Sequence, residues 1–331
     1  MGDLILSTPV LRTLRAAFPD AYLGMAIADE YKPLLQGHPD LNALFLYDKK
    51  GEHRSALGTL KFARQIKEHR FDTALILHST NRAVLTAVLA GIPRRVGYAR
   101  RLGWLLTDAV PYIKSEGTVH EIDYNLQLVK RLGVETADRT TSVALDASAE
   151  PAVTQFLAEN GLTGKPFAVL HPGASCPSKR WPEERFAQLG DWIVGRYQMP
   201  VVVMTGPAER TAGQRVIERM KTPAVSAAGR FNIGELSWLL KKASILISND
   251  SGPVHLACAV GTPVISIFGR WGGGLSPARW GPAGPRAAAL HHDIGCRPCL
   301  AHRCTIGFVC LRAVTVEEAA ASVDFLLKSI G

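Results

Sequence analysis

One stretch decides the predicted fold: Ser244-Ile-Leu-Ile-Ser-Asn-Asp-Ser-Gly-Pro-Val-His-Leu-Ala-Cys-Ala-Val-Gly-Thr-Pro-Val-Ile-Ser-Ile-Phe-Gly269. It opens and closes with apolar runs that are typical of buried parallel strands. Between these runs, Ser251 is a predicted N-cap and Pro253 suits a first helical turn. Gly261 then ends a helix of about two turns. The stretch therefore predicts a strand, a tight turn, a short helix and a second strand.

The junction between the first strand and the helix is a candidate anion site. Backbone N–H groups at a helix start, together with the positive end of the helix dipole, point beyond the carboxyl end of the strand. Gly252 has no side chain and allows a ligand to approach closely. A phosphate group suits this position. For a lone turn of this kind an ordinary capped turn is the favoured explanation, so the rest of the chain has to decide.

The same pattern recurs through the second half of the chain. Buried strands are predicted at 167–171, 201–205, 224–226, 245–248 and 264–268, with helices at 183–197, 208–220 and 234–243. Three strands end in polar turns that contain glycine: His171-Pro-Gly-Ala-Ser175, Thr205-Gly-Pro-Ala-Glu209 and Asn249-Asp-Ser-Gly252. Ligands of open α/β sheets bind outside the carboxyl ends of the strands. The three turns together therefore predict a nucleotide site.

The first half alternates between helices and strands in a similar way. Helices are predicted at 7–18, 59–69, 83–90 and 119–132, and strands at 22–28, 43–47 and 73–78. Such alternation predicts an α/β fold with parallel, doubly wound sheets. The segment from Asp138 to Pro151 is small and polar without a clear period. We therefore expect two domains, residues 1–150 and 151–331.

Composition and charge narrow the class of partner. The chain of 331 residues is 47% hydrophobic, carries a formal net charge of +9 and contains six cysteines. The sequence shows neither a long apolar span nor a secretory leader, and its few cysteines indicate a reducing, cytoplasmic setting. The positive charge favours an anionic partner. Since no nucleic-acid-binding module is visible, we expect a phosphorylated substrate or a phospholipid surface rather than nucleic acid.

Four side chains in or after the predicted turns could take part in chemistry, and each also has a structural explanation. Lys179 could neutralise a phosphate or lie in a solvated basic loop. Glu209 could accept hydrogen bonds from ribose hydroxyls or stabilise a helix start. Asp250 could hold sugar hydroxyls at an exposed edge or cap the helix. His255 is more typical of a packed histidine than of a ligand.

The motifs, in order, resemble those of glycosyltransferase family nine, the heptosyltransferases that build the inner core of lipopolysaccharide. The resemblance covers nearly the whole chain and rests on Gly2-Asp-Leu-Ile-Leu-Ser-Thr-Pro-Val-Leu-Arg12, Arg94-Arg-Val-Gly-Tyr98, His120-Glu-Ile-Asp-Tyr-Asn-Leu126, His171-Pro-Gly-Ala, Lys179-Arg-Trp-Pro182, Thr205-Gly-Pro-Ala-Glu209 and Ser248-Asn-Asp-Ser-Gly-Pro-Val-His255. It implies a GT-B architecture, in which two Rossmann-like domains face each other across a cleft. The acceptor would bind the N-terminal domain and the nucleotide sugar the C-terminal domain.

The resemblance also implies the reaction. Members of this family transfer a heptose from ADP-heptose, with inversion, to a hydroxyl of the inner core, and they need neither a nicotinamide nor a bound metal. By position, Asp3 matches the catalytic base, and Lys179 matches the lysine that contacts the diphosphate. Taken alone, Asp3 is explained equally well as a helix-capping carboxylate. The residues that match the donor loop are Asp250, Ser251, Gly252, Pro253 and His255, while Ser175 and Glu209 match donor contacts less closely.

Two further clusters could bind ligands. Arg94 and Arg95, with Arg100 and Arg101 nearby, could hold phosphates or acidic sugars of a lipid-linked acceptor at the inner membrane surface, although such runs are usually solvated. Four late cysteines could form a structural zinc site: Cys296, Cys299, Cys304 and Cys310. The first pair has the spacing of a zinc ligand pair, but the later gaps are looser than usual. Free or oxidisable thiols are the alternative.

Two features depart from the family pattern. In the family a hydrophobic strand precedes the pair that matches Gly2 and Asp3, whereas this sequence begins at Met1. We therefore expect that the natural start lies upstream and that the first strand of the N-terminal domain is missing. The segment after Ser175 also differs, because it contains Cys176 and Pro177.

Two other functions remain open. The chain could be a GT-B enzyme that uses another nucleotide sugar, for example an epimerase. It could also be a catalytically silent protein that only binds a nucleotide sugar. Release of ADP, of UDP or of neither from a panel of donors separates these functions.

Overall fold

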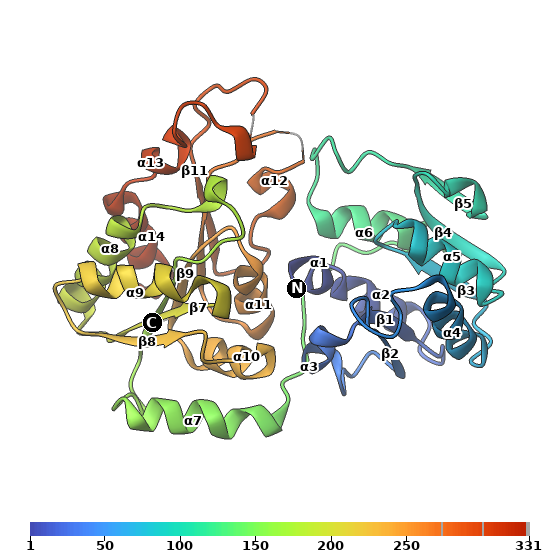
Figure 1. Cartoon of the computed structure of the whole chain (residues 1–331), viewed down its shortest axis with the longest axis horizontal. Helices are drawn as coiled ribbons and strands as arrows, with labels where there is room; N and C mark the ends of the chain where they lie inside the picture. The colour runs from blue at the N-terminus through green and yellow to red at the C-terminus, as the bar shows by residue number, and fades with distance from the viewer. Residues whose placement is uncertain (273, 300, 329–331) are drawn as a thin grey trace. The chain divides into compact units, whose positions relative to one another are not determined.

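The computed structural model describes residues 1–272, 274–299 and 301–328 (Figure 1). The chain divides into two compact units. We call residues 1–5, 116–120 and 140–331 the C-terminal unit, and residues 6–115 and 121–139 the N-terminal unit. Both units contain parallel strands and helices, which confirms the predicted α/β fold class. The predicted domain limits stay a prediction.

The C-terminal unit is built on a six-stranded sheet with the order β11-β10-β9-β6-β7-β8. Its strands are β6 (Ala168–His171), β7 (Val201–Thr205), β8 (Ala224–Ala228), β9 (Ile245–Asn249), β10 (Val264–Phe268) and β11 (Ala287–His291). All pairings are parallel. The chain order reverses between β6 and β9, which makes this pair the topological switch point where ligands of such sheets bind.

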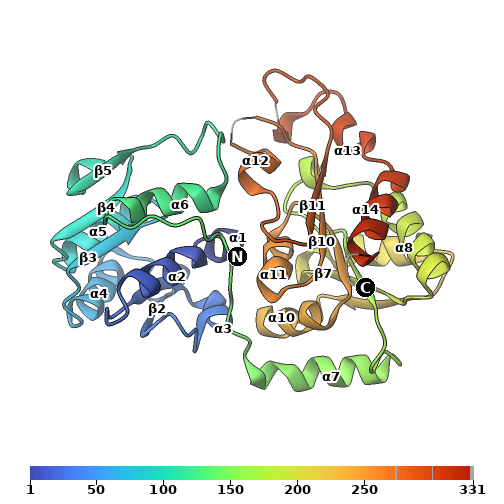
Figure 2. The ribbon, with the colours of Figure 1, turned by 180° about the vertical axis from the view of Figure 1, so that it is seen from behind.

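Helices cover both faces of this sheet, as Figures 1 and 2 show. One layer contains α8 (Glu183–Tyr197), α9 (Arg210–Arg219) and α14 (Val316–Lys328); the other contains α10 (Ile233–Lys242) and α11 (Gly252–Val260). Helix α7 (Glu150–Glu159) packs on α10. Because both faces are covered, every residue of β6, β7, β9 and β10 is buried. The apolar runs of the sequence therefore mark the central strands.

The N-terminal unit contains two groups of parallel strands. The first group is β1 (Gly24–Ala28) with β2 (Ala43–Tyr47), and the second is β3 (Thr73–Ile76), β4 (Arg94–Ala99) and β5 (Asp108–Pro111). The helices of this unit include α2 (Thr8–Ala17), α4 (Ala56–Lys67), α5 (Asn81–Leu89) and α6 (Glu121–Lys130). The Phe45 and Phe71 rings, 5.7 Å apart, join the two groups at one end. The expectation of an upstream strand stays a prediction.

The sequence did not predict three strands, several short helices and two longer ones, α7 and α14. Strand β4 begins with two arginines, β5 contains aspartate and proline, and β11 is rich in alanine, so none has a strong strand pattern. Helices α7 and α14 lie beyond the segments that the sequence analysis assigned. Each belongs to its unit through packing against neighbouring elements.

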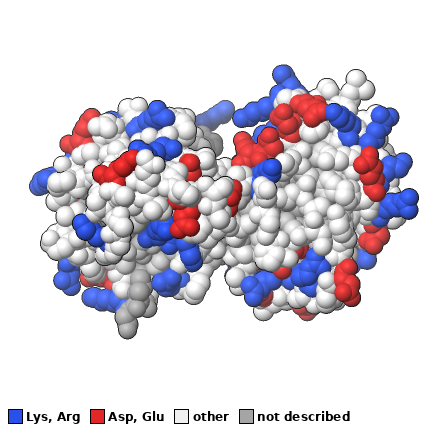
Figure 3. All heavy atoms as spheres, turned by 90° about the horizontal axis from the view of Figure 1, so that it is seen from below, with Lys and Arg blue, Asp and Glu red and all other residues white. Residues whose placement is uncertain are grey.

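Surface charge is mixed on the face drawn in Figure 3, where acidic and basic side chains alternate among uncharged residues. The net charge of +9 therefore does not collect into a single basic surface on the described part of that face. Among the described helices, none has the length and apolar character required to cross a bilayer.

Candidate functional site

Two loops of the C-terminal unit meet at the switch point through a buried histidine. His171 ends β6, and its Nδ1 lies 3.0 Å from Ser248 Oγ and 3.2 Å from Ser251 Oγ. The two hydroxyls are themselves 3.0 Å apart. Burial lowers the pKa of His171 to about 4, so the ring is neutral at pH 7. This polar cluster joins the turn after β6 to the turn after β9.

Asn249 holds a second connection across the switch point. Its Nδ2 donates to Pro172 O at 2.7 Å, and its Oδ1 accepts from Trp181 N at 2.9 Å. The Trp181 side chain is buried, and its Nε1 donates to Val314 O at 3.0 Å. In the sequence, Asn249 stands out only as part of a predicted turn. In the structure Asn249 fixes the start and the end of the loop that carries Lys179.

Lys179 and Arg270 both contact Asp250. Lys179 Nζ lies 3.0 Å from Asp250 Oδ2, and Arg270 Nη2 lies 2.9 Å from the same oxygen. The side chains of Asp250, Arg270 and Lys179 are 7%, 9% and 18% exposed, respectively. The expectation of an exposed Asp250 at the sheet edge is therefore wrong: its carboxylate is buried against Lys179 and Arg270. Sequence analysis did not identify Arg270, since no motif includes it.

Helix α11 begins at this cluster. Ser251 occupies the predicted N-cap position, and Gly261, with a φ of 85°, ends the helix. The Ser251 side chain makes no capping hydrogen bond, because its hydroxyl faces His171 and Ser248. A Cβ on Gly252 would lie 2.5 Å from Met1 Cε, so the flexible Met1 side chain covers this glycine. A ligand that approached Gly252 would have to displace this side chain.

His255, in the first turn of α11, lies against the start of the chain. A Cβ on Gly2 would lie 2.8 Å from His255 Cδ2, and α1 (Gly2–Ile5) packs on α11. Burial lowers the pKa of His255 to about 4, although the nearby charges of Asp250 and Asp3 oppose this effect. Among the described residues, His255 Nδ1 has no hydrogen-bond partner. His255 is therefore packed, as predicted, and the exposed Asp3 is close enough to act on it electrostatically.

Glu209 reaches the turn after β6 from the neighbouring strand. It ends the short helix η5 (Pro207–Glu209) that follows β7. A Cβ on Gly173 would lie 2.4 Å from Glu209 Oε2 and 3.0 Å from His171 Nε2. The carboxylate therefore occupies the space that the missing side chain of Gly173 leaves. Ser175 lies exposed farther along the same turn.

The basic cluster of β4 makes contacts within the N-terminal unit. Arg95 donates to the backbone oxygens of Leu105 at 2.9 Å and Ile92 at 2.6 Å. Arg94 Nη2 donates to Arg131 O at 2.5 Å. Both side chains thus brace the backbone around β4. Their role in acceptor binding stays a prediction.

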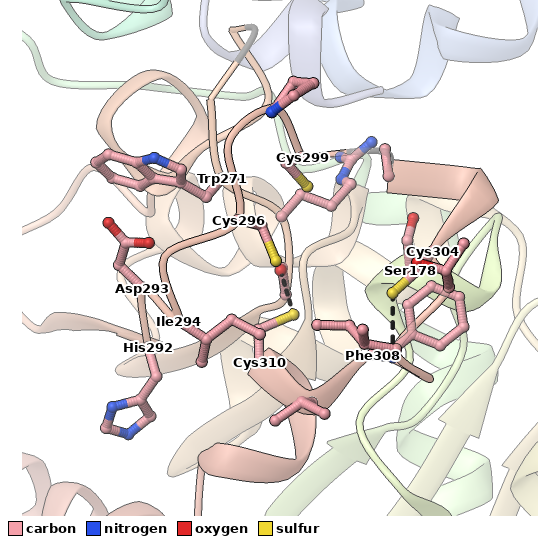
Figure 4. A pocket seen from close by; sticks show the side chains of 17 residues that line it. Ser178, Trp271, His292, Asp293, Ile294, Cys296, Cys299, Cys304, Phe308 and Cys310 are labelled. Carbon is pink, nitrogen blue, oxygen red and sulfur yellow. Dashed lines mark hydrogen bonds between the residues drawn. The ribbon is translucent and has the colours of Figure 1, made fainter.

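The four late cysteines line one cavity of about 180 Å³ (Figure 4). Cys310 Sγ donates to Gly269 O at 2.6 Å, and Cys304 Sγ accepts from Phe308 N at 3.3 Å. Among residues 1–272, 274–299 and 301–328, no three side chains form a group that could hold a metal ion. The expected zinc site of Cys296, Cys299, Cys304 and Cys310 is therefore not formed by the described side chains. Ser178 and Arg270 also line this cavity, which places it beside the Lys179 loop.

A parallel sheet whose switch point carries glycine turns and a short helix start is typical of Rossmann-type domains. The model of glycosyltransferase family 9 (heptosyltransferase) matches residues 59–309. The chain belongs to this family and is a glycosyltransferase. The prediction of the family is confirmed.

The chain is similar to proteins of known class, both in sequence and in fold. The chain is 26% identical to lipopolysaccharide heptosyltransferase 3 of Escherichia coli (strain K12), over 81% of this chain and 79% of that protein. The crystal structure of a family 9 glycosyl transferase from Veillonella parvula DSM 2008 matches with a TM-score of 0.87 and 27% identity, over 99% of this chain and 95% of that one. An E. coli ADP-heptose lps heptosyltransferase II matches with a TM-score of 0.79 and 20% identity, over 99% and 96% of the two chains. The predicted GT-B fold is confirmed.

Proposed function

We propose that this protein transfers a heptose from ADP-heptose, with inversion, to a hydroxyl of the lipopolysaccharide inner core. Family membership and the names of its relatives support the transferred sugar and the lipopolysaccharide acceptor. One similar fold carries ADP-heptose in its name. The observation that carries the proposal is the Lys179–Asp250 ion pair beside the start of α11. With Arg270 on the same carboxylate, this pair forms a cationic site at the edge where α/β sheets bind nucleotides.

In this proposal the diphosphate of the donor lies against the first turn of α11. The helix dipole favours an anion there, and Ser251 does not cap the helix. Lys179 supplies a point charge to the phosphates, and Asp250 holds that lysine in place. Movement of the Met1 side chain off Gly252 gives the phosphates access to the backbone. Glu209, beside Gly173, accepts hydrogen bonds from the ribose hydroxyls.

The chemical step needs a base and a stabilised leaving group. We assign the base to Asp3, which is exposed and acts electrostatically on His255 in the donor helix. Its carboxylate takes the proton of the acceptor hydroxyl while the oxygen attacks the anomeric carbon. The bond to the nucleotide breaks in the same step, and Lys179 with the start of α11 stabilises the negative charge that develops on ADP. Attack on the side opposite the leaving group inverts the anomeric centre.

The acceptor is a lipid-linked, anionic saccharide. We assign its binding to the N-terminal unit, where Arg94 and Arg95 lie on β4. Arg94 is the more exposed of the two, and it is therefore the better candidate for a phosphate or an acidic sugar. Such an acceptor would bring the enzyme to the inner membrane surface. The cytoplasmic setting follows from the same proposal.

The deciding experiment is a donor panel with the full chain and an inner-core lipid acceptor. We expect ADP release only with ADP-heptose, and an anomeric configuration in the product opposite to that of the donor, measured by NMR. UDP release from a UDP-sugar would replace the proposed donor. Binding of a nucleotide sugar without turnover would mean a silent binding protein.

The Asp3→Asn variant tests the base. We expect a fall in kcat of about a hundredfold or more with an unchanged Kd for ADP, because only proton transfer is lost. Asp20→Asn, at another exposed aspartate, is the matched control and should keep full activity. A kcat for Asp3→Asn equal to that of the control would remove Asp3 from the mechanism.

A further inference from the structure

We propose that Arg270 is a second diphosphate-binding side chain of the donor site, which Asp250 keeps in place before the donor arrives. The inference rests on the proposed function, since it needs a nucleotide-linked donor. The family motifs quoted from the sequence do not include Arg270. It follows from the contacts of this residue in the folded chain.

The position of Arg270 suits a ligand of the switch point. It lies two residues after the end of β10, at the same carboxyl edge as the turns after β6 and β9. The residue is only 7% exposed, yet among the described residues its Nε has no hydrogen-bond partner. A buried, unpartnered guanidinium N–H is costly. An acceptor oxygen from a bound ligand would satisfy it.

The positive charge around Arg270 also exceeds the negative charge. Asp250 offers one negative charge to two cations, so the buried group of Asp250, Lys179 and Arg270 carries a net charge of +1. The two nearby histidines do not alter this sum at pH 7, because burial lowers the pKa of His171 and of His255 to about 4. A positive charge with little solvent around it is stabilised by an anion. The cluster is therefore suited to bind one.

The chemistry of the two cations is complementary. Lysine presents a compact charge, whereas the planar guanidinium of arginine donates from several N–H groups and matches phosphate oxygens. The two phosphates of a nucleoside diphosphate offer enough oxygens for both side chains. Asp250 keeps Lys179 Nζ and Arg270 Nη2 on one oxygen, which places the two donors side by side before binding. This preorganisation lowers the entropy cost of binding.

A purely structural role for Arg270 is the alternative, in which it only neutralises Asp250. The two roles differ in what they predict for ligands with and without phosphates. A structural defect would weaken the binding of the whole nucleotide, because it would distort the loops. A lost phosphate contact would weaken only the binding of ligands that carry the diphosphate.

The experiment measures the Kd of ADP and of adenosine by calorimetry for wild type, Arg270→Gln and Arg270→Lys. We expect Arg270→Gln to weaken ADP binding by about ten- to a hundredfold and to leave adenosine binding unchanged. The Kd of Arg270→Lys for ADP should lie between those of wild type and Arg270→Gln, since lysine keeps the charge and loses the planar group. Arg219→Gln, at an exposed arginine of α9, is the matched control and should bind both ligands as wild type does.

Either of two results for Arg270→Gln overturns the inference. Arg270→Gln could bind ADP as tightly as wild type does, or it could lose ADP and adenosine affinity by the same factor. Thermal unfolding without ligand shows whether each variant folds. If Arg270→Gln does not fold, Arg270→Lys decides: selective weakening of ADP supports the inference, and unchanged ADP affinity overturns it.

The outcome for wild type separates this inference from the proposed function. If wild type binds UDP and not ADP, the proposed donor is wrong, and the same comparison of UDP with uridine tests Arg270. If wild type binds neither diphosphate, both the proposed function and the inference fail. If wild type releases ADP from ADP-heptose while Arg270→Gln shows no selective loss, only the inference fails.

Discussion

Ser251 Oγ lies 3.2 Å from His171 Nδ1, and it makes no hydrogen bond that caps α11. The residue that the sequence marks as a helix cap therefore links two loops instead. Because the Ser251 hydroxyl faces His171, the N-terminal end of α11 lacks the side-chain acceptor that an N-cap serine usually supplies. The first turn of α11, at the switch point, is therefore not capped by the Ser251 side chain.

A methyl group at Gly252 should have little effect on stability but should weaken donor binding. In Gly252→Ala the new Cβ would meet the flexible end of the Met1 side chain, which can move. We therefore expect the free energy of unfolding to change by less than about 1 kcal/mol. The same methyl group would occupy the space where a phosphate approaches the backbone. We expect the Kd for ADP, measured by calorimetry, to rise about tenfold or more.

Gly195→Ala is the control for this substitution. Gly195 lies exposed in α8, and a Cβ there would meet no atom within 4 Å. It should raise the stability of the protein by about 0.5–1 kcal/mol, because alanine favours a helix, and it should not affect ADP binding. Equal ADP affinity in the two variants would argue against a phosphate at Gly252.

Lys179→Met should weaken use of the donor more than it disturbs the fold. Arg270 still neutralises Asp250 in this variant, so no buried carboxylate is left without a partner. We expect kcat/KM for the donor to fall about a hundredfold, the typical effect of losing a charge-assisted hydrogen bond to a phosphate that becomes stronger in the transition state. Steady-state kinetics at saturating acceptor measures this change.

The matched control is Lys165→Met, at an exposed lysine of the same unit. Its kcat/KM should equal that of wild type. A comparable loss in both variants would point to a general effect of net charge and not to a phosphate contact.

Asp250→Asn should destabilise the C-terminal unit, because it leaves the buried Arg270 and the partly buried Lys179 without a negative partner. Breaking a buried ion pair on one side typically costs about 3–5 kcal/mol. Thermal unfolding of the free protein should therefore occur at a clearly lower temperature. ADP should raise the unfolding temperature of the variant if its phosphates reach the two cations.

Asp293→Asn serves as the comparison. Asp293 pairs with Arg297 at the surface, where an ion pair contributes little to stability. Its unfolding temperature should stay close to that of wild type. Asp250→Asn with the same unfolding temperature would contradict the buried cluster.

The two buried histidines should make stability depend on pH. Burial lowers the pKa of His171 and of His255 in the folded state to about 4, from 6.5 when exposed. Between these values the unfolded chain binds more protons than the folded protein, so the free energy of unfolding falls as the pH drops from about 6.5 to about 4. The loss is on the order of 2–3 kcal/mol for each histidine.

Urea unfolding at pH 7 and at pH 5 measures this effect. His171→Asn and His255→Asn should each reduce the difference between the two pH values, because each removes one group that takes up a proton on unfolding. If His171→Asn and His255→Asn show the wild-type difference, the two histidines do not titrate as stated.

The central strands of the C-terminal unit were predictable because their patterns are local. Strands β7 and β10 were predicted with the bounds they have in the structure, since each is a mostly apolar run that ends in a turn. Strand β11 was not predicted, because three alanines and a leucine do not distinguish a strand from a helix. Its pairing with β10 places it in the sheet.

The candidate site was only partly predictable. Lys179 and Asp250 stand in motifs, and the structure brings them together at 3.0 Å. Arg270 has no motif, and its contact with Asp250 depends on the pairing of β9 with β10. The zinc expectation was drawn from spacing alone, but spacing does not determine where thiols point.

The sequence by itself determined the fold class, the family motifs and the residues at the start of α11, because hydrophobic period, turn residues and motif order are properties of neighbouring residues. The tertiary structure alone decided that Ser251 faces His171, that Asp250 is buried and that Lys179 and Arg270 share one oxygen. These contacts join residues that are far apart in the chain, and only the packing of strands from separate segments sets the distances between them.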